Sequence, residues 1–230
     1  LNIDFIENTL YIVNERSDGV FLETLNISPA VVDTGATYLT YLDRKLQDDS
    51  TGVTVAYNAG TNLTTITLPF TITNTMKVVG RVGGSNTAGQ AITTASQSGT
   101  DITITGNYSS SNLWIGEQFE FSFVFSQQFI QVADAVGSRI SVKEGRLQIR
   151  NWNVSFNDTG YFTTEVVPVG RDTSTSTYSG TVTGSGALGT VSLDDGDFTF
   201  SVQSENDKLT VSLKNDSHLP SNFINASWQG

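Results

Sequence analysis

Hydrophobic and polar residues alternate with a period of two along most of the chain. Phenylalanine occupies positions 119, 121, 123 and 125, which places four aromatic side chains on one face of a single strand. The same alternation recurs at residues 53–57, 102–104, 198–202 and 209–213. Gly, Asn, Asp, Ser and Thr interrupt these runs about every 8–12 residues, a spacing typical of sandwiches and barrels. The pattern predicts an all-β fold of antiparallel sheets with no long helix.

The first half of the chain is predicted to begin as a three-stranded meander. Its strands are expected at residues 3–5, 10–13 and 20–25. A connector over residues 29–46 returns to strand at 38–42, and residues 47–70 form a hairpin around Asn58-Ala59-Gly60. Residues 71–118 are rich in Gly, Ser and Thr, and they predict a small exposed sheet with a mobile loop near residues 83–97.

Two lobes are expected, a meander or platform lobe over residues 1–115 and an antiparallel β-sandwich lobe over residues 116–230. The boundary is placed where the Gly/Ser-rich chain gives way to the bulky aromatic strand. Within the second lobe, residues 129–135 are the best candidate for a helix, of about two turns at most. A type I′ turn at Asp195-Gly196 is expected to join strands at 191–193 and 198–202.

The segment 145–170 is predicted to be a hairpin with a tight turn at residues 157–160. Leu147 and Ile149 alternate along its first strand, whereas Trp152, Val154 and Phe156 lie on the opposite parity. This switch of parity indicates either a bulge near Asn151 or a strand buried on both faces.

Composition narrows the functions to consider. The chain has 230 residues, no Cys, 12 Lys and Arg against 23 Asp and Glu, and a formal net charge of −11. The absence of Cys excludes disulfides and thiolate metal sites, and the acidity argues against tight binding to duplex DNA or to an anionic membrane. No apolar run approaches the ~20 residues of a membrane span. The chain starts at Leu1 and its only Met is Met76, so we expect a fragment of a longer protein.

The titratable residues do not form a recognisable catalytic pattern. His218 is the only histidine and is interpreted as a surface residue, because a hydrolytic triad needs an aligned nucleophile and acid. The carboxylate pairs Glu117 with Glu120 and Asp158 with Glu165 are interpreted as charges on exposed faces rather than as a glycosidase pair. No residue is therefore assigned a catalytic, cofactor-binding or metal-binding role.

Other polar and aromatic motifs have simpler structural explanations. Asp194-Asp195-Gly196-Asp197 offers oxygen ligands to calcium, but it lacks the EF-hand spacing. Trp114 and Trp152 are interpreted as core residues rather than as a sugar platform. Four further acids are assigned to turns, at positions 101, 158, 172 and 207. Seven N-x-S/T sequons, at Asn26, Asn62, Asn107, Asn153, Asn157, Asn215 and Asn225, are expected by chance in a chain so rich in Asn, Ser and Thr.

The sequence allows two interpretations of three arginines in the second lobe. Arg146, Arg150 and Arg171 are candidates for an interface or for buried ion pairs, because the guanidinium fork suits carboxylates. The alternative is that each is a solvated surface charge.

Several sequence blocks, in order along the chain, resemble the tail nozzle family (tail tubular protein B) of short-tailed, T7-like bacteriophages. The blocks lie at residues 8–23, 41–45, 67–70, 115–119, 125–129, 145–162, 170–172, 215–221 and 226–230. There are departures, since Lys45 replaces the second Arg of the family's Leu-Asp-Arg-Arg motif and Gln229 replaces a Glu. The family's basic tail after the final Gly is not present in this sequence.

The resemblance implies a structural virion protein, the C-terminal part of a nozzle, with no enzymatic activity and no cofactor. Six copies would form the distal tail tube, next to the adaptor (tail tubular protein A) and the tail fibres, after assembly in the host cytoplasm. The genome would pass through without sequence-specific binding. The alternative is a receptor- or carbohydrate-binding β-sandwich of a viral tail, and a tail-associated glycan hydrolase comes third.

Overall fold

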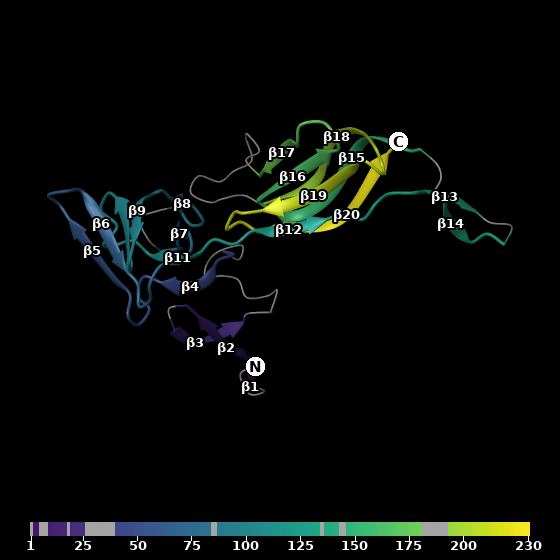
Figure 1. Cartoon of the computed structure of the whole chain (residues 1–230). Coiled ribbons are helices and arrows are strands. Elements are labelled where there is room, and N and C mark those ends of the chain that lie inside the picture. Colours follow the sequence, from purple (N-terminus) through teal and green to yellow (C-terminus); the bar gives the residue numbers. More distant parts are fainter. Residues whose placement is uncertain are drawn as a thin grey trace. The chain divides into compact units, whose positions relative to one another are not determined.

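The structure is a computed structural model that describes residues 2–4, 9–17, 19–25, 40–83, 87–133, 136–142, 146–180 and 193–230. Within these ranges the chain forms antiparallel sheets and no helix, so the all-β prediction is confirmed (Figure 1). The chain divides into two compact units, one built on Leu1–Phe119 and the other on residues from 120 onward. The predicted lobe boundary near residue 115 stays a prediction.

The first unit begins with the expected meander and continues with two four-stranded sheets. The meander has the order β1 (Asn2–Asp4), β2 (Thr9–Arg16), β3 (Gly19–Leu25). One four-stranded sheet has the order β5 (Thr54–Asn58), β6 (Leu63–Thr67), β10 (Asp101–Thr105), β9 (Thr94–Ser98). The other has the order β4 (Asp43–Gln47), β11 (Leu113–Glu117), β7 (Met76–Gly80), β8 (Ala91–Ile92).

Both four-stranded sheets contribute to the core of the first unit. Ile66 and Ile102 from one sheet pack with Val78 and Ile115 from the other, and all four are fully buried. Asn58 pairs with Leu63 across the predicted hairpin turn, which is confirmed.

Two details of the first-unit prediction are wrong. The segment 71–118 is not a small exposed sheet, because β7 and β11 lie in the core and residues 91–98 are largely strand. The prediction followed the high Gly, Ser and Thr content of the whole segment and gave too little weight to the short apolar stretches 76–80 and 113–117. The expected strand at 38–42 begins instead at Asp43, and residues 38 and 39 lie outside the described part.

The second unit is a β-sandwich with a projecting hairpin. One sheet has the order β12 (Phe121–Val124), β19 (Leu209–Asn215), β16 (Tyr161–Pro168), β17 (Ser174–Ser179). The other has the order β18 (Asp194–Glu205), β15 (Gln148–Thr159), β20 (Asn222–Gln229). The hairpin pairs β13 (Ile130–Ala133) with β14 (Arg139–Val142) and extends away from the sandwich (Figure 1).

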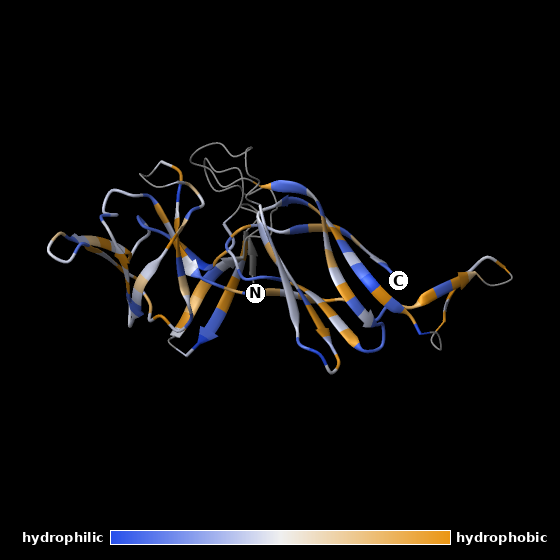
Figure 2. Ribbon diagram, turned by 90° about the horizontal axis from the view of Figure 1, so that it is seen from above, coloured by the Kyte–Doolittle hydropathy of each residue, from blue (hydrophilic) through white to orange (hydrophobic). Residues whose placement is uncertain are grey.

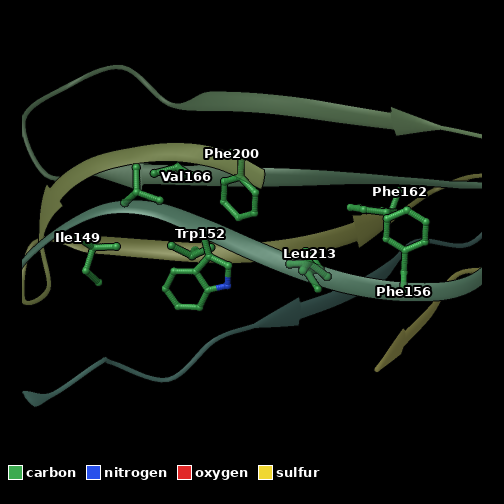
Figure 3. Packing of buried hydrophobic residues seen from close by; sticks show 10 residues of the cluster. Ile149, Trp152, Phe156, Phe162, Val166, Phe200 and Leu213 are labelled. Carbon is green, nitrogen blue, oxygen red and sulfur yellow. The ribbon is translucent and has the colours of Figure 1, made fainter. Parts of the chain in front are cut away.

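The sandwich encloses an aromatic core. Figure 3 shows Trp152 and Phe156 of one sheet pointing between the layers toward Phe162 and Leu213 of the other. The Phe156 and Phe162 ring centroids are 5.5 Å apart at an interplanar angle of 64°, an edge-to-face geometry favoured by the ring quadrupoles. The period-two positions at 198–202 and 209–213 face this core, as predicted.

The predicted hairpin over residues 145–170 is wrong. Strand β15 pairs only with β18 and β20, whereas β16 pairs with β17 and β19, so the chain crosses between sheets near Gly160. A Cβ on Gly160 would lie 2.9 Å from the Leu219 Cβ, so this crossing requires glycine. The predicted bulge is confirmed, since the β15–β18 register shifts between Ile149 and Asn151.

Two further local predictions are wrong. The helix candidate at 129–135 contains strand β13 over Ile130–Ala133, while residues 134 and 135 lie outside the described part. The Asp195-Gly196 turn does not form, because both residues belong to the continuous strand β18. A second register shift, opposite Phe156 and Thr159, accommodates this Gly-containing stretch without ending the strand.

Candidate functional site

A buried ion cluster in the first unit is centred on Glu117, the last residue of β11. Its side chain is only 4 % exposed, and it accepts hydrogen bonds from two arginines. Arg16 Nη1 donates to Oε2 at 3.2 Å, and Arg44 Nη1 donates to Oε1 at 3.2 Å. Asn74 Nδ2 also donates to Oε2, at 3.2 Å. Glu117 is therefore not the exposed-face charge that the sequence predicted.

Arg44 is held in this cluster by aromatic rings as well as by charge. Its guanidinium carbon lies 3.5 Å from the Phe70 ring centroid and 4.6 Å from that of Phe21, both within cation–π range. Its backbone has φ 47°, an uncommon conformation for a residue other than glycine. Such a strained residue persists where its surroundings fix it, and here the side-chain contacts do so.

Glu23 completes the cluster. Arg16 Nη2 donates to Glu23 Oε1 at 3.1 Å, and Arg44 Nε lies 4.0 Å from the same oxygen. Two arginines and two glutamates thus balance in charge while connecting β2 and β3 to β4 and β11. The cluster fastens the N-terminal meander to the neighbouring sheet.

The sequence contains an indication of the residues of this cluster, although the sequence analysis did not predict that they come together. Arg16, Glu23, Arg44, Phe70 and Glu117 all fall within the blocks that carry the family resemblance. Arg16 and Glu117 are 101 residues apart, so no local spacing rule connects them. The block pattern indicated which residues matter, but only the fold brings them together.

Trp114 lies in the core, as predicted, beneath two cations. Lys45 Nζ is 4.5 Å and the Arg81 guanidinium carbon 5.4 Å from its ring centroid. Arg81 also bonds to Gln47 and lies 3.5 Å from Asp49 Oδ1. The indole face is therefore engaged within the protein rather than offered to a sugar.

The predicted acid–base candidates do not come together. His218 is buried at 8 % exposure, so its assignment to the surface is wrong. Glu120 is exposed. Asp158 is exposed on β15, and its backbone N–H donates to Asp195 Oδ1 at 2.8 Å. Glu165 on β16 lies 2.9 Å from Lys214 Nζ, which raises the pKa of that lysine through a hydrogen bond and charge attraction.

The acids at the start of β18 bond to neutral donors. Asp197 Oδ1 accepts from Ser155 Oγ at 2.5 Å and from Asn153 Nδ2 at 3.3 Å. Burial and then the charges of Asp194 and Asp195 raise the pKa of Tyr178. Over the described ranges, no group of three or more His, Cys, Asp or Glu is arranged to hold a metal ion.

An aromatic pocket of about 740 Å³ lies at the base of the β13–β14 hairpin. Phe125, Phe129, Leu147 and Trp228 contribute to its lining. Trp152 borders it but is only 2 % exposed, so the prediction that this residue belongs to the core is confirmed.

Arg146, Arg150 and Arg171 are all exposed, so the buried-pair interpretation is wrong for each of them. Arg146 and Arg171 line a shallow basin of about 450 Å³ together with Lys208. Arg171 Nη2 donates to the Gln203 carbonyl at 2.7 Å, which fixes the guanidinium beside the basin.

Asn215 shows that the block 215–221 is structural. It is 6 % exposed, and its Nδ2 donates to the Leu219 carbonyl at 2.9 Å and to Ser221 Oγ at 3.0 Å. Its Oδ1 accepts from the Ser217 N–H at 2.8 Å, so the side chain organises the turn before β20. Among the other sequons, Asn26 lies outside the described residues.

Buried charges and aromatic packing stabilise two units made only of antiparallel sheets in the described ranges, which defines an all-β protein. A family model described as "Bacteriophage nozzle protein" matches residues 1–230, and the chain belongs to this family. It is also 26 % identical, over 235 residues, to Tail tubular protein gp12 of Escherichia phage T7. That match covers 98 % of this chain and 29 % of the phage T7 protein.

The family match confirms the predicted resemblance and the prediction of a structural phage tail nozzle protein. It indicates a component of the virion tail and suggests a role without catalysis. Among the described residues, no helix is long and apolar enough to cross a membrane.

Proposed function

We propose that this chain forms part of the wall of a phage tail nozzle through which the genome leaves the particle. The match of the whole chain to the nozzle family carries this proposal. Two β units, each with its own buried core, suit a rigid wall, because the backbone N–H and C=O groups of a sheet are held by hydrogen bonds between neighbouring strands.

The wall is proposed to be a homohexamer that contacts an adaptor and the tail fibres and assembles in the host cytoplasm. With six copies the formal charge is 6 × −11, or −66. Acidic groups that face a channel repel phosphate and let DNA slide without sequence-specific binding. In this proposal the chain catalyses no reaction and binds no cofactor.

Interruption of the encoding gene tests the proposal. Particles made without the protein should carry truncated tails and fail to retain or deliver DNA, and expression in trans should restore them. Electron microscopy of the tails and a nuclease-protection assay of packaged DNA provide the readouts. Intact tails with normal DNA delivery in its absence would contradict the proposal.

A receptor- or carbohydrate-binding role is a second candidate, favoured by the aromatic pocket beside Phe125, Phe129 and Trp228. Aromatic faces over an open pocket suit sugar rings. A glycan array with the chain should then give hits that Trp228→Ala abolishes. An array without hits would leave only the structural role.

A further inference from the structure

A basic basin lies at the end of β18 on an otherwise acidic protein. Arg146, Arg171 and Lys208 line it, with Glu205 as its one acidic group. The residues that line the basin carry 3 − 1 = +2, and the rest of the chain carries −11 − 2 = −13, including Asp207, whose charge also acts on Lys208. A local positive charge in this setting attracts an anionic partner of limited size.

Contacts within the protein hold two of the three basic side chains of the basin. Arg171 is anchored on the Gln203 carbonyl at 2.7 Å. Lys208 Nζ lies 2.5 Å from Glu205 Oε2, and this hydrogen bond raises the pKa of the lysine. The same bond lowers the pKa of Glu205, to which the charge of Arg146 also contributes. Lys208 and Glu205 therefore both keep their charges at neutral pH.

The opposite end of the same strand is acidic. Asp194, Asp195 and Asp197, here called the acidic end, form no ion pair with any cation in the part of the chain that the structure describes. Asp195 and Asp197 are exposed. Burial, and after it the charges of Asp194 and Asp195, raise the pKa of Tyr178, which lies beside this end.

The length of β18 separates the two charged surfaces. From Asp194 to Glu205 the strand advances 11 residues, or about 36 Å at ~3.3 Å per residue. One chain cannot bring its own basin and acidic end together. Two copies can do so in a head-to-tail contact, the heterologous type that closes into rings.

We propose that the basic basin binds the acidic end of β18 from a second copy of this chain. The inference rests on the proposed multi-copy nozzle and identifies the surfaces that join neighbouring copies. Duplex DNA fits the basin less well, because a long phosphate array beside it would meet the −13 carried by the rest of the chain.

A charge-swap experiment tests the contact. The basin variant carries Arg146→Glu, Arg171→Glu and Lys208→Glu, with net charge −11 − 6 = −17. The end variant carries Asp194→Lys, Asp195→Lys and Asp197→Lys, with net charge −11 + 6 = −5. Each alone places like charges across the contact, whereas an equimolar mixture restores opposite charges at every contact.

Sedimentation of the 230-residue chain at low salt should show self-association that weakens at least tenfold in each variant. The equimolar mixture should recover it, and a mixture of the basin variant with wild type should not recover it fully. Circular dichroism verifies that both variants are folded. Unchanged association in either variant, a mixture that does not recover, or a strictly monomeric wild type would overturn the inference.

Cross-linking provides a second readout, because the chain has no native Cys. Lys208→Cys combined with Asp195→Cys should give disulfide-linked ladders under oxidation. The matched control, Lys208→Cys with Thr61→Cys at an exposed residue of the first unit, should give far fewer. Lys208→Cys with Asp195→Cys in assembled particles distinguishes a failure of this contact from a failure of the proposed nozzle function. Tails that form normally without cross-links overturn this contact but leave the nozzle function intact.

Duplex DNA is the alternative ligand of the basin. Loss of duplex binding in the basin variant, with unchanged self-association, would show that the basin binds DNA and would overturn the inference.

Discussion

At the scale of single residues, a few polar side chains hold distant segments together. Glu117 receives hydrogen bonds from Arg16, Arg44 and Asn74, and Asn215 organises the turn before β20. All of these residues except Asn74 lie in the family blocks, which do not indicate their contacts. Pairings across more than 70 residues depend on the fold, which no local pattern specifies.

Glu117→Gln should destabilise the first unit strongly. The substitution leaves Arg16 and Arg44 facing a neutral group in a buried setting, where breaking an ion pair costs about 3–5 kcal/mol. Urea unfolding measures the change. Asp49→Asn is the control, because its carboxylate is 67 % exposed and an exposed pair contributes about 1 kcal/mol or less. Equal losses in the two variants would contradict a central role for Glu117.

Tyr178 should make the second unit sensitive to alkaline pH. Burial, Asp194 and Asp195 raise its pKa above the usual 10.0, so the folded state holds this proton more tightly than the unfolded state. The stabilisation is present below about pH 10 and is lost as the pH rises through the folded pKa. Tyr178→Phe should flatten the fall in unfolding free energy above pH 10, measured by denaturant titration. An equally steep fall in Tyr178→Phe would contradict this role of the Tyr178 hydroxyl.

At the scale of elements, alternation predicted most strands, and the errors share a cause. The pattern of residues 145–170 describes two strands and a turn equally well whether they pair or separate into two sheets. Alternation likewise does not tell a central strand from an edge strand: β12 lies at a sheet edge, where Phe121 and Phe123 are 42 % and 50 % exposed. Alternation identifies a face, whereas partners and sheet edges depend on contacts distant in sequence.

Gly116→Ala should separate β4 from β11. A Cβ there would lie 2.7 Å from the Leu42 Cβ and 2.8 Å from the Asp43 carbonyl oxygen, neither of which is the end of a flexible side chain. We expect a loss of about 1–3 kcal/mol, typical of overpacking. Gly196→Ala is the control, because its nearest neighbour is Phe156 at an ordinary 3.5 Å. A neutral Gly116→Ala in urea unfolding would refute this packing.

The β13–β14 hairpin should exchange its amide hydrogens faster than β15 does. Ile130 pairs with Val142 and Val132 with Ile140, giving an apolar face that Figure 2 shows on strands projecting from the sandwich. Val132 and Ile140 are 48 % and 52 % exposed, and a lone two-stranded ribbon is marginally stable in water. Hydrogen exchange with mass spectrometry measures this, on the chain at a salt concentration at which sedimentation shows it to be dissociated. Equal protection of hairpin and β15 would be the opposing result.

At the scale of the whole molecule, the sequence predicted the fold class and the protein family, but it did not predict which strands and side chains are in contact. The all-β fold follows from periodicity, and the nozzle family follows from ordered blocks that no single motif carries. The net charge of −11 further argued against a protein that binds duplex DNA tightly. The ion cluster, the sheet crossing at Gly160 and the basic basin required the structure, because each joins residues from separate strands.

Cryo-electron microscopy of the intact tail of the encoding phage tests the central claim most directly. We expect several copies of the chain arranged around the channel that carries DNA, with density that fits both the Glu117-centred unit and the Trp152-centred sandwich. Density for these units outside the tail tube, or a tail without them, would contradict it.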